Sequence, residues 1–285
     1  MSSVASTTVP ASAAASDVAR VGDLLRDWRH RRHLSQLDLA IAAEVSPRHL
    51  SFVETGRSKP SRELLLHLAE HLEVPLRERN HLLLAAGYAP VHTETPLDAA
   101  PMGPVRDALD KILAGHEPYP AVVVDQRWDL VTGNAPAMGI LGDGVAPSLL
   151  APPVNVIRVC LHPDGLASRI VNLAEYSEHL MVRLHRQALL SQDPGLAALL
   201  DEMREYPGVR QASSSAVDET TLLFVPLRLR VGDAVLSFFS TIATFGTALD
   251  ITLAELAIEQ FFPADPATAA ALHGSGAPDP AKLRP

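Results

Sequence analysis

The sequence predicts an α+β protein of two domains: an all-helical domain of five helices over residues 18–90 and a mixed domain over residues 105–272. Three observations lead to this prediction. The chain has 285 residues, a length that suits two domains of ordinary size. Its first part has apolar residues at helical spacing, whereas strand patterns and turn signals follow only after residue 118. Between the two parts, the Pro-rich and aperiodic residues 91–104 are expected to form a linker.

The five expected helices of the first domain each carry an apolar stripe. In the second and third helices, which a tight turn joins, Ser35 and Ser46 can act as N-caps, and Ser61 can cap the fourth helix. Pro47 then falls at a first helical position, where its missing N–H does no harm. The helices lie within residues 18–33, 34–60 (the joined pair), 61–74 and 76–86.

The third helix has one outward face, formed by Pro47, Arg48, His49, Ser51 and Phe52. A short helix with Arg, His and hydroxyl groups near its N-terminus fits the major groove of DNA. We expect Arg48 to read a base edge, most simply that of guanine, and Phe52 to contact a thymine methyl group. Gln36, at the start of the second helix, and Arg57 and Lys59, in the loop after the third, should bind phosphate or the rim of the groove. The expected DNA-contacting residues are Gln36, Ser46, Pro47, Arg48, His49, Ser51, Phe52, Arg57 and Lys59.

Residues 34–60 resemble the helix-turn-helix of Cro/repressor-type (XRE-like) regulators. The resemblance implies a lambda-repressor-like DNA-binding domain that binds double-stranded DNA as a homodimer, with half-sites roughly 34 Å apart. Glu44 departs from the pattern, because such motifs usually have Gly in the turn. If this position needs a positive φ, Glu costs roughly 1–2 kcal/mol relative to Gly. The matching letters are Leu34-Ser35-Gln36, Leu39-Ala40, Val45-Ser46, Leu50-Ser51 and Glu54-Thr55-Gly56.

A net charge of −9 is unfavourable for binding DNA, but the charge is unevenly distributed. Residues 1–90 carry a net charge of +1, and the remainder carries −10. Within the first part, basic residues cluster at positions 26–32 and 57–59, where they could contact phosphate. The acidic second part cannot favour phosphate contact.

The second domain is expected to begin with a helix over residues 105–114 and to contain two strands, then helices, then three strands. Asn134 ends the second strand and can cap a short helix. Five antiparallel strands flanked by helices on one side resemble a PAS-like sensor arrangement. The strands are expected at residues 121–125, 128–132, 221–230, 234–245 and 251–262, and the central helices at 155–161, 166–190 and from 193 onward.

A more specific resemblance covers most of the chain, from about Arg20 to Leu272. Its motifs resemble those of the MmyB-like transcription regulators. This resemblance implies a bacterial repressor or activator with a PAS-like domain for a fatty-acid-like ligand. The motifs are HEPYP at residues 116–120, HPDGL at 162–166, LSFFSTIATFGT at 236–247, FFPAD at 261–265, PLRERN at 75–80 and AGYAP at 86–90.

The apolar strand faces of the second domain, closed by helices, suit a pocket for a small and mostly apolar ligand. Polar groups at the ends of apolar elements could hold its polar head, and aromatic and aliphatic side chains could line the rest. An ordinary core, with Asn134 acting only as a cap, explains the same residues equally well. The candidate ligand-binding residues are Trp128, Leu130, Asn134, Val159, His162, Phe239, Thr241 and Phe245.

Two alternatives remain open from the sequence. The first is an enzyme with a DNA-binding domain, such as a metal-dependent hydrolase that uses His162 or the pair His67 and His71. That pair matches an HxxEH string and could share zinc, but it lies on the flank of its helix and a solvated face is the simpler interpretation. The second is a domain that binds a protein partner and has no small-molecule pocket. We expect no enzyme, no resident cofactor and no metal, because no GxSxG, GxGxxG, Walker or CxxC motif occurs.

The remaining features indicate a cytoplasmic protein without membrane association. No apolar run is long enough to span a bilayer, and the N-terminus does not resemble a secretory signal. The single Cys160 excludes an internal disulfide and is interpreted as a small buried apolar residue. Residues 1–17 and 273–285 are expected to be disordered tails.

Overall fold

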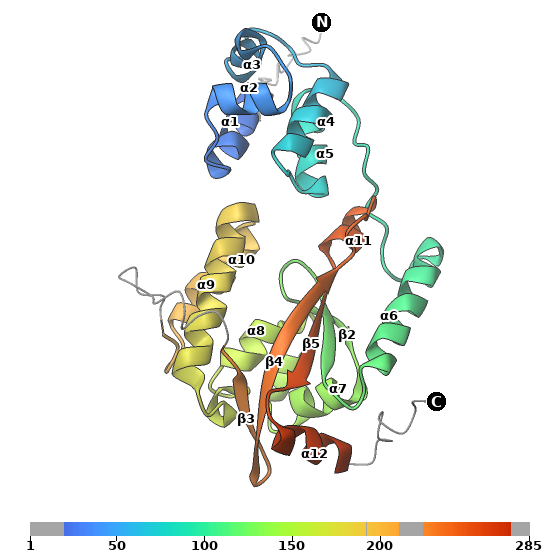
Figure 1. Ribbon diagram of the computed structural model, residues 1–285, viewed down its shortest axis with the longest axis vertical. Helices are drawn as coiled ribbons and strands as arrows, with labels where there is room; N and C mark the ends of the chain where they lie inside the picture. The colour runs from blue at the N-terminus through green and yellow to red at the C-terminus, as the bar shows by residue number, and fades with distance from the viewer. Residues whose placement is uncertain (1–19, 192, 211–224, 275–285) are drawn as a thin grey trace, which may run out of the picture. The chain divides into compact units, whose positions relative to one another are not determined.

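A computed structural model describes residues 20–191, 193–210 and 225–274 of the chain (Figure 1). Two compact units divide between Thr93 and Glu94. The predicted tail over residues 1–17 and residues 275–285 of the other predicted tail lie outside the described part. His273 and Gly274, which were also assigned to a tail, instead end helix α12.

The N-terminal unit consists of five helices, as the sequence predicts. Their buried stripes form one core around Leu25, Leu39, Leu50, Leu65 and Leu83, all 1 % exposed or less. The helices are α1 (Val21–Arg31), α2 (Gln36–Ala42), α3 (Pro47–Glu54), α4 (Arg62–His71) and α5 (Leu76–Ala85).

Two of the three predicted serine caps form. The Ser35 hydroxyl accepts a hydrogen bond from Asp38 N, and the Asp38 carboxylate accepts one from Ser35 N, a reciprocal capping box. The Ser61 hydroxyl accepts a hydrogen bond from Leu64 N at the start of α4. Ser46 occupies the N-cap position of α3, but its side chain makes no capping hydrogen bond, so that expectation is wrong.

The turn between α2 and α3 has a backbone conformation that is costly for Glu44, the residue found there. Glu44 has φ of 52°, in the left-handed region that Gly adopts without penalty.

We expect Glu44→Gly to raise the free energy of unfolding of this unit by about 0.5–1 kcal/mol, because relief of strain exceeds the entropy that Gly adds to the unfolded chain. Hydrogen exchange of the α1–α3 amides measures the change. The control is Glu70→Gly, on the exposed face of α4, which should lower the free energy of unfolding by about 1 kcal/mol. A lower free energy of unfolding in both variants would contradict the strain argument.

The C-terminal unit is built on a five-stranded antiparallel sheet in the order β2-β1-β5-β4-β3. Along the chain, two strands are followed by a run of helices and then by three more strands, as predicted, and short 3₁₀ turns occur at Ala100–Met102, Pro147–Leu150 and Ala167–Arg169. The elements are α6 (Gly103–Gly115), β1 (Ala121–Val124), β2 (Leu130–Gly133), α7 (Ala135–Gly142), α8 (Val156–Leu161), α9 (Leu173–Ser191), α10 (Pro194–Arg204), β3 (Leu227–Val231), β4 (Ala234–Thr244), α11 (Ile251–Glu255), β5 (Ala257–Pro263) and α12 (Pro266–Gly274).

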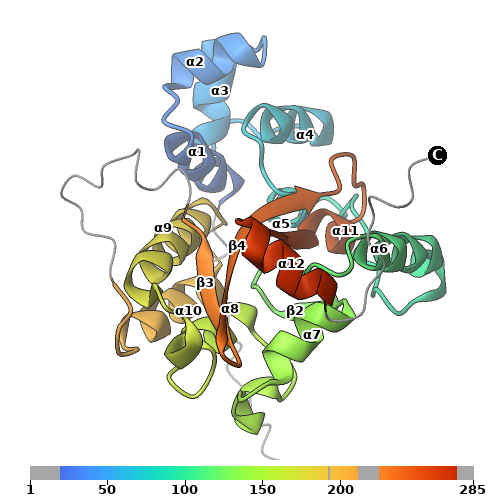
Figure 2. The same cartoon turned by 60° about the horizontal axis from the view of Figure 1, so that its bottom comes forward.

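Helices cover both faces of this sheet, not one face as predicted. On the first face, α7 to α10 pack against strand residues such as Val122 and Phe238 to form the larger core. On the second, α6 packs against Val123 and Ile258, and Figure 2 shows α6 and α9 on opposite sides of the strands. Helix α12 follows β5, and its Thr268 hydroxyl accepts a hydrogen bond from the backbone N–H of Ser237 in β4. Because successive strand residues point to opposite faces, neighbouring residues of β1 belong to different cores: Val122 and Val124 to the larger, Ala121 and Val123 to the smaller.

Several predicted boundaries differ from the observed ones. The expected strand over residues 251–262 is wrong at its start, because the Asp250 carboxylate caps α11 through Thr252 N and β5 begins only at Ala257. The expected helix over residues 166–190 divides, because Ile170 forms a bridge with Leu229 before α9 begins. Of the strand expected at 221–230, residues 221–224 lie outside the described part.

The expected linker is held by specific contacts at its C-terminal end. The Thr95 hydroxyl donates to Asp250 over 2.7 Å, and Arg106 donates to the carbonyls of Leu97 and Ala99. Met102 is buried. Residues 94–104 therefore belong structurally to the C-terminal unit.

Candidate DNA-contact surface and ligand cavity

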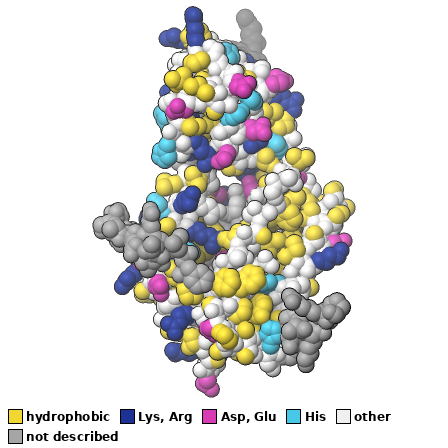
Figure 3. All heavy atoms as spheres, in the orientation of Figure 1, with side chains coloured by type: hydrophobic (Ala, Val, Ile, Leu, Met, Phe, Trp, Pro, Cys, Tyr) yellow, Lys and Arg dark blue, Asp and Glu magenta, His cyan; other side chains and the backbone are white. Residues whose placement is uncertain are grey.

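The outward face of α3 has the composition needed at a DNA interface. Ser46, Pro47, Arg48 and His49 are exposed, whereas Leu50 and Val53 point into the core. Ser51 and Phe52 are half-buried. Lys and Arg side chains protrude at the top of Figure 3, over the end of the N-terminal unit where Figure 1 shows α2 and α3.

Phe52 organises the basic groups of this face. The guanidinium carbon of Arg48 lies 5.4 Å from the centre of the Phe52 ring, and that of Arg57 lies 5.9 Å from it. The Arg57 backbone N–H also donates to the Phe52 carbonyl over 2.8 Å. Two cations are thus gathered around one aromatic ring by cation–π attraction. Lys59 lies 5.0 Å from the ring of Tyr88 and extends the basic surface beyond the helix.

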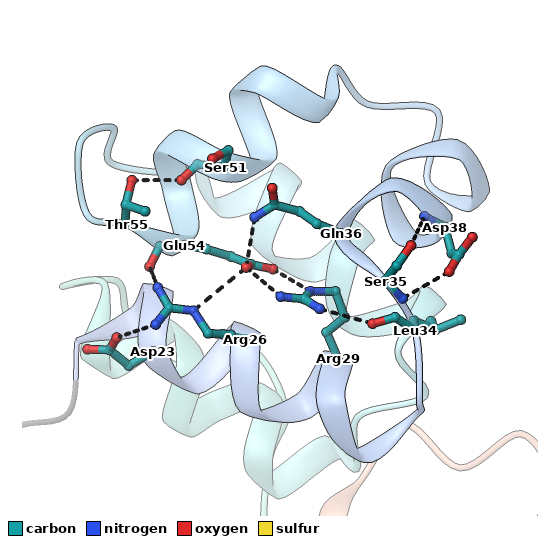
Figure 4. Close-up of polar contacts among 10 residues, drawn as sticks. All are labelled: Asp23, Arg26, Arg29, Leu34, Ser35, Gln36, Asp38, Ser51, Glu54 and Thr55. Atoms are coloured by element: carbon teal, nitrogen blue, oxygen red, sulfur yellow. Dashed lines mark hydrogen bonds and ion pairs between the residues drawn. The ribbon is translucent and has the colours of Figure 1, made fainter.

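A buried carboxylate fixes α3 to the rest of the unit (Figure 4). Glu54 is 2 % exposed and accepts two hydrogen bonds of 2.8 Å from the Arg29 guanidinium in a bidentate pair. Gln36 donates to the same carboxylate over 3.0 Å, and Arg26 donates to the Glu54 carbonyl over 2.9 Å. Burial alone would raise the pKa of Glu54, but the hydrogen bonds from Arg29 and Gln36 outweigh it and lower that pKa. Helices α1, α2 and α3 therefore meet at one ionised group.

This network changes the interpretation of two residues. Arg29 belongs to the basic cluster at positions 26–32 that was expected to be available to phosphate, but it is buried, and its hydrogen bond with Glu54 raises its pKa. Gln36 is half-buried with its amide bonded to Glu54, so its phosphate contact remains a prediction. Gly22 of α1 permits the close helix contact, because a Cβ there would lie 2.4 Å from the Val53 carbonyl oxygen.

An apolar cavity of about 70 Å³, partly open to solvent, lies in the C-terminal unit between the first face of the sheet and its covering helices. Burial raises the pKa of the Cys160 thiol to about 12 and also raises that of the Tyr176 phenol, so both groups in its wall are neutral. Glu259 contributes the charged group of the lining. The remaining lining comes from the strands and helices and includes Val122, Ala137, Ile140, Leu141, Val156, Ile157, Leu166, Leu180, Leu227, Leu229, Phe238 and Phe261.

A smaller and polar hollow of about 20 Å³ shares Tyr176, Phe238 and Glu259 with the cavity. Its other polar groups are Arg183 and His179 of α9 and Ser240 of β4. Ser240 donates to the Glu259 carboxylate over 2.8 Å, and Arg183 donates to the same oxygen over 3.4 Å. The apolar space thus has one polar end.

Two comparisons with known families agree with this architecture. Residues 105–274 match the model of the MmyB-like transcription regulator ligand binding domain, and residues 20–82 match a helix-turn-helix domain model. The first match alone covers more than half of the chain. The chain belongs to the MmyB-like transcription regulators. No curated protein matches it. Both matched families are binding domains of regulators, and neither is a family of enzymes.

The cavity of this MmyB-like regulator lies on the face of β4 opposite to the one expected. Phe239 stacks on Phe262 on the second face, Thr241 points to the same side, and Phe245 packs in the smaller core with α6. Alternation correctly separated these residues from Phe238, but they do not line this cavity, so their ligand contacts remain predictions. Among the described residues that line the cavity, none is one of the eight candidates.

The other candidates have structural contacts in the regulator. Asn134 caps α7 and donates to the Tyr119 carbonyl over 2.8 Å, which ties β1, β2 and α7 together. Val159 is fully buried in the larger core, and Leu130 packs against it. His162 ends α8, where its ring accepts a hydrogen bond from Asp164 N. Their ligand contacts remain predictions, and none is used below.

Trp128 has a positional role that the sequence did not suggest. Its indole N–H donates to Gln187 over 2.8 Å, and the Arg183 guanidinium lies 4.1 Å from its ring centre. It therefore holds the arginine of the polar hollow. Tyr176, Arg183 and Glu259 were missed because Glu259 follows the other two by 76 residues or more, and only the assembled fold brings α9 and β5 together.

The histidines suggested as zinc ligands act within the helical unit. His67 lies with Nε2 2.8 Å from the Ala43 carbonyl, at the end of α2, and its ring contacts that of His71 edge to face. Within residues 20–191, 193–210 and 225–274, no group of three or more His, Cys, Asp and Glu side chains is arranged to hold a metal. In the same residues, no helix combines the length and hydropathy that a bilayer crossing requires.

Proposed function

We propose that this MmyB-like regulator recognises specific DNA sequences through α3 and that a small apolar ligand of fatty-acid-like shape, bound in its cavity, changes its affinity for DNA. The observation that carries the proposal is the cavity, which combines an apolar wall with one polar end in a chain that also bears a helix-turn-helix. Pockets with this composition suit small amphiphiles.

Arg48 is the residue best placed to read a base. It is exposed near the N-terminus of α3, and its attraction to Phe52 limits its freedom before DNA arrives. We expect Arg48→Ala to weaken specific binding by about 1–3 kcal/mol and to relax selectivity at one base pair. Competition gel shifts against operators varied one base pair at a time measure this effect.

The matched control for this prediction is Arg186→Ala, which removes the same charge from the exposed side of α9. It should leave affinity nearly unchanged. If Arg48→Ala weakens specific and random duplexes equally, Arg48 contacts phosphate and does not read a base.

A ligand can switch the regulator only if it binds the two DNA-affinity states unequally. Native mass spectrometry of the freshly purified protein should show a bound amphiphile, and its removal should change the measured operator affinity. Unchanged affinity would remove the switching part of the proposal. The protein should form a homodimer on a two-fold symmetric operator, which sedimentation with and without DNA would measure.

The alternative is that the acidic C-terminal unit binds a protein partner and no small molecule. The apolar cavity between the sheet and its helices favours the ligand, because a surface that docks a protein needs no such hollow. A protein purified without ligand that gains no thermal stability from any tested amphiphile would favour the alternative.

A further inference from the structure

The polar end of the cavity contains one positive and one negative side chain held against each other. Glu259 lies on β5 beside Val122 of β1, and its side chain is 9 % exposed. Arg183 reaches it from α9, with its guanidinium placed by the Trp128 ring. Ser240 of β4, which is exposed, donates a second hydrogen bond to the same carboxylate oxygen. The charge at this end is therefore balanced before any ligand enters.

The other nearby titratable group does not supply a second cation. Burial, together with the neighbouring Arg183 charge, lowers the pKa of His179, so its imidazole is neutral near pH 7. A ligand carboxylate entering the hollow would have to share a single guanidinium with Glu259. Two carboxylates at one partly desolvated site repel each other, which disfavours the charged ligand.

An uncharged head that both donates and accepts hydrogen bonds meets no such repulsion. An N–H or O–H can donate to the Glu259 carboxylate, which lines the hollow. A carbonyl or hydroxyl oxygen can accept from Arg183 or from the neutral Tyr176 hydroxyl. We propose that Glu259 is a specificity residue that selects amphiphiles with a neutral donor–acceptor head, such as a primary amide or alcohol, over free carboxylates. This inference rests on the proposed ligand-binding function.

The test compares two probes with the same apolar chain, decanamide and decanoate, on the full-length protein stripped of lipid. Isothermal titration at pH 7.5 should show decanamide binding at least about tenfold more tightly than decanoate. Glu259→Gln keeps the shape and an acceptor oxygen but removes the charge, and should bring the two affinities to within about threefold. Glu205→Gln, an exposed residue that follows α10, is the matched control and should keep the wild-type preference.

The possible results distinguish the neutral-head inference from the apolar-ligand proposal on which it rests. Equal or tighter binding of decanoate by the wild type overturns the neutral-head inference and leaves the apolar-ligand proposal standing. Binding of neither probe overturns both. An unchanged preference in Glu259→Gln, with the fold verified by its melting curve, shows that Glu259 is not the selecting residue and also overturns the inference.

Discussion

Replacing Glu54 by alanine is expected to destabilise the N-terminal unit by about 3–5 kcal/mol. The mutation leaves the Arg29 guanidinium, which is 8 % exposed, without its bidentate partner in a site that excludes water. It also frees the Gln36 amide, which links α2 to the same carboxylate. A loss of this size is a large fraction of the stability of an ordinary domain.

Hydrogen exchange of the full-length protein measures this loss in the α1–α3 amides separately from those of the C-terminal sheet. Glu70→Ala, on the exposed side of α4, is the control and should change exchange by less than about 0.5 kcal/mol. Glu54→Ala should also abolish operator binding, because α3 loses its fixed position. Normal protection in α1–α3 of Glu54→Ala would show that the ion pair contributes little to this unit.

The same carboxylate gives the stability of this unit a defined dependence on pH. The pKa of Glu54 in the folded protein is below its ordinary value of 4.5, so the folded state binds the proton less readily than the unfolded chain. The stabilisation is complete above pH 4.5 and is lost as the pH falls through the lowered pKa. Protection of α1–α3 should decline on acidification below pH 4.5 in the wild type, and Glu54→Gln should lack this component.

Local signals account for most of what the sequence predicts correctly in the helical unit. The Ser35 and Ser61 caps and the turn at Glu44 depend on residues close together in the chain, and the structure confirms all three. Arg29 was missed because charge was taken to mean exposure. It lies four residues after buried Leu25 and seven after Gly22, so it belongs to the inward stripe of α1.

The cavity could not be placed from the sequence because both faces of β4 are apolar. Alternation separates Phe238 from Phe239, but it does not say which residue faces the cavity and which faces the other side of the sheet. That choice depends on pairing with β5, from which the Phe238 face receives Phe261 and Glu259. The signal that could have helped is Glu259 itself, an acidic residue in an otherwise apolar strand, where an ionised group needs partners.

Replacing Phe238 by alanine is expected to cost the C-terminal unit about 3–5 kcal/mol and to enlarge its cavity. Phe238 is 1 % exposed, lines the cavity and lies 6.4 Å, centre to centre, from the ring of Phe261. Denaturant melts followed by exchange of the sheet amides measure the loss. Phe239→Ala, one residue along on the other face, is the matched control; Phe239 is half-buried, and its loss should cost less and leave the cavity unchanged.

The enlarged cavity also tests whether this space can hold a ligand. An apolar space of this kind binds small apolar molecules such as benzene, and binding to the folded state alone stabilises it. Benzene at about ten times its Kd should return roughly 1.4 kcal/mol to Phe238→Ala and much less to Phe239→Ala. Equal rescue of the two variants would indicate nonspecific solvent effects. No rescue of Phe238→Ala would mean that the sheet and helices collapse into the vacated volume, and that the wild-type cavity is not held open by a rigid frame.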